Sequence, residues 1–170
     1  MVIWISGMPG TGKSTLAKYY YLQHKKKIRN LILIDGDDFR KSMNNDLGYT
    51  LKDRKKNALR LIKFAKYFSN QNVNVIISAN LVFQKYRNWC KKNIPHFLEV
   101  YINSKLELLT KRNKKKIFYN LKKNVLGQDI KVKKPNNPHL IIENNLSKKN
   151  FLSTIKLIDK TINKKKIKIY

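Results

Sequence analysis

The segment at residues 7–14 restricts the fold of this chain more than any other part of the sequence. It matches the pattern GxxxxGK[ST] in full. Its residues are Gly7, Met8, Pro9, Gly10, Thr11, Gly12, Lys13 and Ser14. The apolar run before it, at residues 2–5, is typical of a buried parallel strand, and a helical stretch follows from about Ser14. A strand, this loop and a helix in succession predict a phosphate-binding loop.

The residue types in this loop suit a nucleoside triphosphate. Glycines let successive backbone N–H groups curl around phosphate oxygens, and the N-terminus of the following helix adds partial positive charge. Lys13 supplies a cation to the phosphates, and Ser14 offers a hydroxyl to Mg²⁺. We therefore predict that residues 7–14, together with Thr15, bind ATP or GTP. Lys13 is expected to take part in catalysis, and Ser14 to be a metal ligand.

Strand and helix patterns alternate along the rest of the chain. Apolar runs predict further strands at residues 31–34, 73–79, 97–102 and 140–142. Helical spacing or composition predicts helices at residues 14–27, 53–70, 84–92, 104–112 and 148–163. This alternation predicts an α/β fold of the P-loop NTPase type, a three-layer sandwich with a mainly parallel sheet covered by helices on both faces. We expect a single domain over residues 1–170, with a lid at about residues 113–138.

A second polar motif directly follows the predicted strand at residues 31–34. It reads Asp35, Gly36, Asp37, Asp38, Phe39 and Arg40. The carboxyl ends of parallel strands open onto one crevice, so we expect Asp35 and Asp37 near the phosphate loop. A carboxylate there can accept a hydroxyl proton or help to hold Mg²⁺, and Arg40 can bind an anionic group on an acceptor. Asp35 is predicted to be both a catalytic residue and a metal ligand.

The composition sets broader limits. The formal net charge of +28 attracts anions of every kind and selects none of them. The favoured interpretation is that the lysines are scattered over solvated faces of the protein. The alternative is a nucleic-acid-binding groove, but the lysine clusters match no known nucleic-acid-binding motif. The single cysteine, Cys90, excludes an internal disulfide, and no apolar run approaches the ~20 residues of a membrane-spanning helix. We expect a cytoplasmic protein without membrane insertion.

Beyond these two motifs, the sequence resembles the adenylylsulfate (APS) kinase family over about residues 2–145. The resemblance rests on short segments spread along the chain. They are Asn45 to Tyr49, Asp53, Arg54, Asn57, Arg60, Phe97 to Tyr101, Gly127, Asp129, Pro135, Asn137 and Pro138. The resemblance implies an enzyme that uses ATP and Mg²⁺ to phosphorylate the 3′-hydroxyl of adenosine 5′-phosphosulfate, which gives PAPS.

The resemblance also implies roles for individual residues. Asp35 would be the base for the 3′-hydroxyl, and Arg112 would pack against the base of ATP. The residues that would contact the acceptor are Asp37, Arg40, Tyr49, Arg54, Asn57 and Lys115. Among these, Tyr49 would stack on the acceptor base, and Lys115 would reach into the site from the lid. The implied partners are nucleotides, and a homodimer is a further expectation.

The chain departs from the family pattern on the acceptor and lid side. Residues 80–83 lack the serine that the family usually has after the third strand, and residues 112–118 lack a glycine and an acidic residue of the family's lid motif. Val125 stands where the family has a second aromatic residue opposite Tyr49. Losing one stacking partner costs about 1–3 kcal/mol per base, enough to change which base is preferred.

These departures leave three functions open. APS is the favoured acceptor because family membership is the strongest argument available. A related kinase that phosphorylates cytidine diphosphoramidate, for surface-polysaccharide modification, is the alternative within enzymes, since such proteins resemble the chain in the valine-containing segment before Gly127. A degenerate, basic module that binds nucleotides or nucleic acid is the non-enzyme alternative. The retained Lys13, Ser14, Asp35 and Arg40 count against it.

Overall fold

The computed structural model describes residues 1–105, 107–109, 124–144 and 151–170, and its strands form one sheet. The strands are β1 (Val2–Gly7), β2 (Leu31–Asp35), β3 (Asn74–Ser78), β4 (Phe97–Asn103) and β5 (Leu140–Glu143). They lie in the order β2-β3-β1-β4-β5, and each neighbouring pair is parallel. The predicted parallel sheet is confirmed, and all five strands share one direction.

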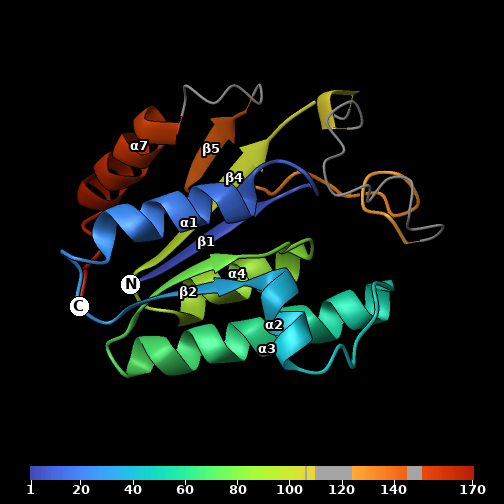
Figure 1. The fold of residues 1–170 in the computed structure, drawn as a ribbon, viewed down its shortest axis with the longest axis horizontal. Coiled ribbons are helices and arrows are strands. Elements are labelled where there is room, and N and C mark those ends of the chain that lie inside the picture. Colours follow the sequence, from blue (N-terminus) through green and yellow to red (C-terminus); the bar gives the residue numbers. More distant parts are fainter. Residues whose placement is uncertain (106, 110–123, 145–150) are drawn as a thin grey trace.

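Helices cover both faces of this sheet, as Figure 1 shows. The helices α1 (Lys13–His24) and α7 (Phe151–Lys164) pack on one face, and α3 (Leu51–Asn70) and α4 (Gln84–Asn93) pack on the other. Each face has its own apolar core, and the central strands β1 and β3 are buried along their whole length. The three-layer α/β architecture predicted from the alternating elements is therefore confirmed.

Strand β1 illustrates why the sequence folds in this way. Its side chains alternate between the two cores, with Ile3 and Ile5 facing α1 and α7 and Trp4 facing α3 and α4. A strand buried on both sides needs apolar residues at successive positions, and residues 2–5 supply them. The indole N–H of Trp4 donates a hydrogen bond to the Ala79 carbonyl oxygen at 3.0 Å. Trp89 on α4, by contrast, is 43% exposed.

One element was not predicted from the sequence. A short helix, α2 (Gly36–Ser42), continues directly from β2, where only an acidic motif was expected. In the predicted lid, residues 113–123 lie outside the described part of the chain, and the described residues 124–138 contain no helix. Among the described residues, no helix is long and apolar enough to cross a membrane.

A buried ion pair joins α4 to the sheet. Arg87 of α4 pairs with Glu99 of β4, and the two side chains are 3% and 0% exposed. Lys91 lies one helical turn further along and places its ammonium nitrogen 3.2 Å from the other Glu99 oxygen. Arg87 also donates to the Ser6 hydroxyl at 3.4 Å, directly before Gly7. The pair therefore connects α4, β4 and the end of β1.

Candidate active site

The phosphate loop connects β1 to α1 at the carboxyl edge of the sheet. A Cβ atom at Gly7 would lie 2.6 Å from the Ile102 carbonyl oxygen, so β4 leaves room only for glycine. Gly12 caps α1 in the left-handed conformation, with φ of 90°, which favours glycine for a different reason. Ser14 and Thr15 occupy the exposed first turn of α1. The predicted loop thus stands at the N-terminus of a helix, as anion binding requires.

Internal hydrogen bonds hold the loop in shape. The Lys13 ammonium and the Thr11 hydroxyl each donate to the Met8 carbonyl oxygen at 2.9 Å. The Asn144 side-chain amide, which follows β5, donates to the Thr11 carbonyl oxygen at 2.8 Å. Asn144 was not predicted from the sequence, although its place after a parallel strand could have suggested it.

A cavity of about 410 Å³ lies beside the loop and brings together residues from both sequence motifs. Ser14, Asp35, Asp37 and Tyr49 line it, as the prediction of a shared crevice requires. The remaining lining residues, which were not predicted to be site residues, are Lys18, Leu33, Asp38, Lys41 and Asn45. Both cations and carboxylates therefore surround the space next to α1.

Asp35 lines this cavity at the end of β2, with its carboxylate held by a helix cap. Its Oδ1 accepts a hydrogen bond from the Asp37 backbone N–H at 3.0 Å, which caps α2 and fixes the carboxylate. Its Oδ2 is buried and has no hydrogen-bond partner among the described residues. The Ser14 hydroxyl lies 3.4 Å from the Ser78 hydroxyl at the end of β3. One carboxylate and one hydroxyl suit Mg²⁺, which usually keeps several waters and binds substrate phosphates as well.

Tyr49 lies against two arginines predicted to bind the acceptor. The guanidinium carbons of Arg40 and Arg54 lie 4.9 and 5.2 Å from the ring centroid. Arg40 is buried and donates to the carbonyl oxygens of Leu47 and Gly48 at 3.1 and 2.8 Å. Arg54 donates to the carbonyl oxygens of Tyr49 and Asn124 at 2.8 and 3.0 Å, and burial lowers its pKa. The arginines therefore hold the Tyr49 loop as well as carrying charge.

The remaining predicted residues divide into two groups. Asn57 is buried on α3, and its side-chain oxygen has no hydrogen-bond partner among the described residues. Arg112 and Lys115 lie outside the described part of the chain. Val125, which replaces the family's second aromatic residue, is 1% exposed. Within the described residues, no three His, Cys, Asp or Glu side chains gather as a metal cluster, so a metal here would depend on the mixed ligands described above.

A phosphate loop at the head of α1, facing a carboxylate at the end of β2 across one cavity, defines a P-loop kinase. The sequence profile of the family described as adenylylsulphate kinase matches residues 1–143. The chain belongs to this family, and its class is that of nucleotide kinases with an alcohol group as phosphate acceptor.

Two curated relatives with different names are similar to the chain. A cytidine diphosphoramidate kinase of Campylobacter jejuni is 32% identical over 165 residues, which cover 95% of each chain. An adenylyl-sulfate kinase of Clostridium acetobutylicum is 33% identical over 151 residues, which cover 84% of this chain and 74% of the relative.

A solved structure shows the same fold. The APS kinase of Mycobacterium tuberculosis in complex with AMPPNP and APS superimposes with a TM-score of 0.82, at 24% identity, and covers 95% of this chain and 96% of that chain. The family and fold expected from the sequence are therefore confirmed.

Proposed function

We propose that the protein transfers the γ-phosphoryl group of ATP to the 3′-hydroxyl of a nucleotide that carries a modified phosphate. The observation that carries this proposal is the single cavity lined by Ser14, Asp35 and Tyr49. This cavity brings the serine at the end of the phosphate loop together with a carboxylate and an aromatic ring. Phosphoryl transfer needs mainly positioning and charge stabilisation, and these residues supply both.

Each residue has a separate task in this proposal. Lys13 neutralises charge on the phosphates, and the loop N–H groups orient them. The Asp35 carboxylate accepts the hydroxyl proton, and with Ser14 it would hold Mg²⁺, which supplies further charge neutralisation. Tyr49 provides a surface for the acceptor base, and Arg54 provides positive charge beside it.

We propose cytidine diphosphoramidate as the acceptor. One supporting observation is that the similarity to the Campylobacter jejuni kinase extends over 95% of both chains. The other is the buried Val125, which offers no second ring to a base stacked on Tyr49. A purine would lose more stacking area than a pyrimidine when one aromatic surface is absent. The absence of a second ring therefore reduces the stacking advantage that a larger base would have over a pyrimidine at this site.

APS is the second candidate, and it is the acceptor that the sequence alone favours. It is supported by the family match over residues 1–143 and by the 33% identity to an adenylyl-sulfate kinase. Both acceptors are anionic nucleotides with a small group on a phosphate, so the same catalytic residues would serve either reaction.

The test is a coupled assay of ADP formation with Mg²⁺, in which cytidine diphosphoramidate and APS are offered separately. We expect kcat/KM to be higher for the cytidine derivative, and ³¹P NMR of the product to show a new 3′-phosphomonoester. A preference for APS would replace the proposed acceptor with the second candidate. No turnover with either nucleotide or with a wider acceptor panel would contradict the kinase proposal and favour the non-enzyme alternative.

A further inference from the structure

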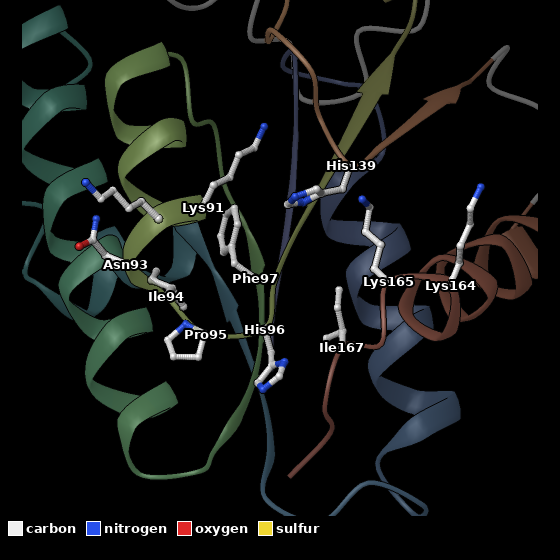
Figure 2. A pocket seen from close by; sticks show the side chains of 11 residues that line it. Lys91, Asn93, Ile94, Pro95, His96, Phe97, His139, Lys164, Lys165 and Ile167 are labelled. Atoms are coloured by element: carbon white, nitrogen blue, oxygen red, sulfur yellow. The ribbon is translucent and has the colours of Figure 1, made fainter.

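A second hollow, of about 650 Å³, lies at the opposite edge of the sheet from the phosphate loop. Figure 2 shows it between α4, the start of β4 and the end of α7. Ile94, Phe97 and Ile167 give it an apolar wall. Since all five strands are parallel, residues at the start of β4 and residues at the ends of the strands belong to different edges. The hollow is therefore separate from the candidate active site.

Lysines line this hollow from two sides. Lys91 and Lys92 come from α4, and Lys164 and Lys165 come from the end of α7 and the residue after it, as Figure 2 shows for all but Lys92. Of these, Lys91 is already engaged, because its ammonium group contacts Glu99 and donates to the Asn137 carbonyl oxygen at 2.6 Å. Among the described residues, no Asp or Glu lines the hollow, and the other three lysines have no acidic partner there.

His139 lines the hollow beside the lysines. Its Nδ1 accepts a hydrogen bond from the Glu99 backbone N–H at 2.9 Å, which requires an unprotonated nitrogen. Burial, followed by the charges of Lys91 and Lys165, lowers the pKa of His139 to about 4. Figure 2 shows the side chains of Lys165 and His139 near one another in the hollow. Like charges that depress a neighbour's pKa would be relieved by a bound anion.

We propose that this hollow is a second anion-binding site, for a compact chain of phosphate groups such as an inorganic oligophosphate or the phosphate tail of a nucleotide. Lysine ammonium groups bind phosphates as compact point charges, and several of them can contact one phosphate chain. The volume lies in the range of small-ligand sites. The lysines line the hollow from two separate elements, α4 and the end of α7, which suits a short anion better than an extended nucleic-acid strand.

The first test uses the histidine ring signals in NMR spectra of the protein saturated with AMPPNP and Mg²⁺, so that the phosphate loop is filled. The chain has only three histidines, of which His96 and His139 line the hollow and His24 does not. Titration with inorganic tripolyphosphate is expected to shift the His96 and His139 signals and to raise the pKa of His139. The His24 signal should stay unchanged. Equal shifts at all three rings, or none, would contradict the proposal.

The second test compares two double variants by calorimetry under the same conditions. Lys164→Gln/Lys165→Gln should weaken tripolyphosphate binding by at least about tenfold. Lys26→Gln/Lys27→Gln removes the same charge from exposed lysines that do not line the hollow, and should change the affinity by less than about twofold. Equal weakening in both variants would mean that the net charge binds the anion diffusely, and would overturn the proposal.

Three ligands distinguish the sources of the phosphate chain. Tripolyphosphate, ATP and a short single-stranded oligonucleotide are titrated against the AMPPNP-saturated protein. Tighter binding of tripolyphosphate would identify a free oligophosphate, and tighter binding of ATP that is lost in Lys164→Gln/Lys165→Gln would identify a nucleotide; both support the compact site. If the oligonucleotide binds most tightly and both double variants weaken it equally, a nucleic-acid surface replaces the proposal. None of these readouts depends on the identity of the kinase acceptor.

Discussion

At the scale of single residues, Asp35 is where catalysis can be tested most directly. Asp35→Asn keeps the size of the side chain but removes the carboxylate whose Oδ2 has no partner among the described residues. We expect kcat to fall by about 10²–10⁴-fold, the usual contribution of a catalytic base. The affinity for AMPPNP should stay nearly constant without Mg²⁺. The matched control is Asp38→Asn, in the same cavity but paired with Lys41, and a similar loss there would argue against a special role for Asp35.

Asn144 offers a test of loop geometry. Asn144→Ala removes the hydrogen bond from its side chain to the Thr11 carbonyl oxygen. A hydrogen bond of this kind contributes about 0.5–1.5 kcal/mol, so nucleotide affinity should fall by roughly two- to tenfold, measured by calorimetry with AMPPNP. Asn163→Ala, at an exposed position of α7, is the control. Unchanged affinity would mean that the loop keeps its shape without this contact.

His139 gives a prediction about pH. Because its pKa is lowered from 6.5 to about 4, folding favours the neutral ring. This contribution to stability is complete above pH 6.5 and is lost as the pH falls toward 4. Urea unfolding at a series of pH values should show a smaller drop over this window for His139→Gln than for the native chain. An NMR titration giving His139 an ordinary pKa would contradict the prediction.

The residue scale also shows what the sequence could and could not predict. The placement of Asp35 followed from its position at the end of a parallel strand, which the local pattern alone supplied. The contacts of Arg40 with Leu47, Gly48 and Tyr49 could not be predicted from the sequence. A guanidinium group can bind an anion or donate to buried carbonyl oxygens, and the sequence does not distinguish the two. Only the folded chain shows how many of its donors are already used.

At the scale of secondary structure elements, the pair between Arg87 of α4 and Glu99 of β4 is the clearest case for mutation. Arg87→Met should lower the free energy of unfolding by about 3–5 kcal/mol, because Glu99 would remain buried without its main counter-charge. The double variant Arg87→Met/Glu99→Leu should recover much of this loss, as measured by urea denaturation. A double variant as unstable as the single one would mean that packing, and not the unpaired charge, causes the loss.

The elements that the sequence predicted best are those with strong local periodicity. The central strands are continuous apolar runs, and α3 carries one apolar face into the core. By contrast, α2 is a single short helix that begins at the Asp35 N-cap. A short acidic segment of this length is equally compatible with a turn, so the sequence alone did not predict the helix. The ion pair of Arg87 and Glu99 joins elements by a contact that no spacing rule reveals.

At the scale of the whole molecule, the charge of +28 predicts how salt affects stability. Repulsion among like charges destabilises the compact state, and salt screens it. Raising NaCl from low to moderate concentration should therefore raise Tm by at least about 2–4 °C, which corresponds to about 1 kcal/mol for a chain of this size. Differential scanning fluorimetry measures it, with an uncharged osmolyte as control. A Tm that falls or stays constant with NaCl would show that the lysines are spaced too widely to repel one another.

The two tryptophans give the molecule a natural pair of optical probes. Trp4 is fully buried between strands and helices, and Trp89 is exposed on α4. A soluble quencher will therefore reach only one of them, and the remaining, blue-shifted emission will come from the strand that leads directly into the phosphate loop. Intrinsic fluorescence of a Trp89→Phe variant would follow events at the centre of the sheet during a single turnover, with no attached dye.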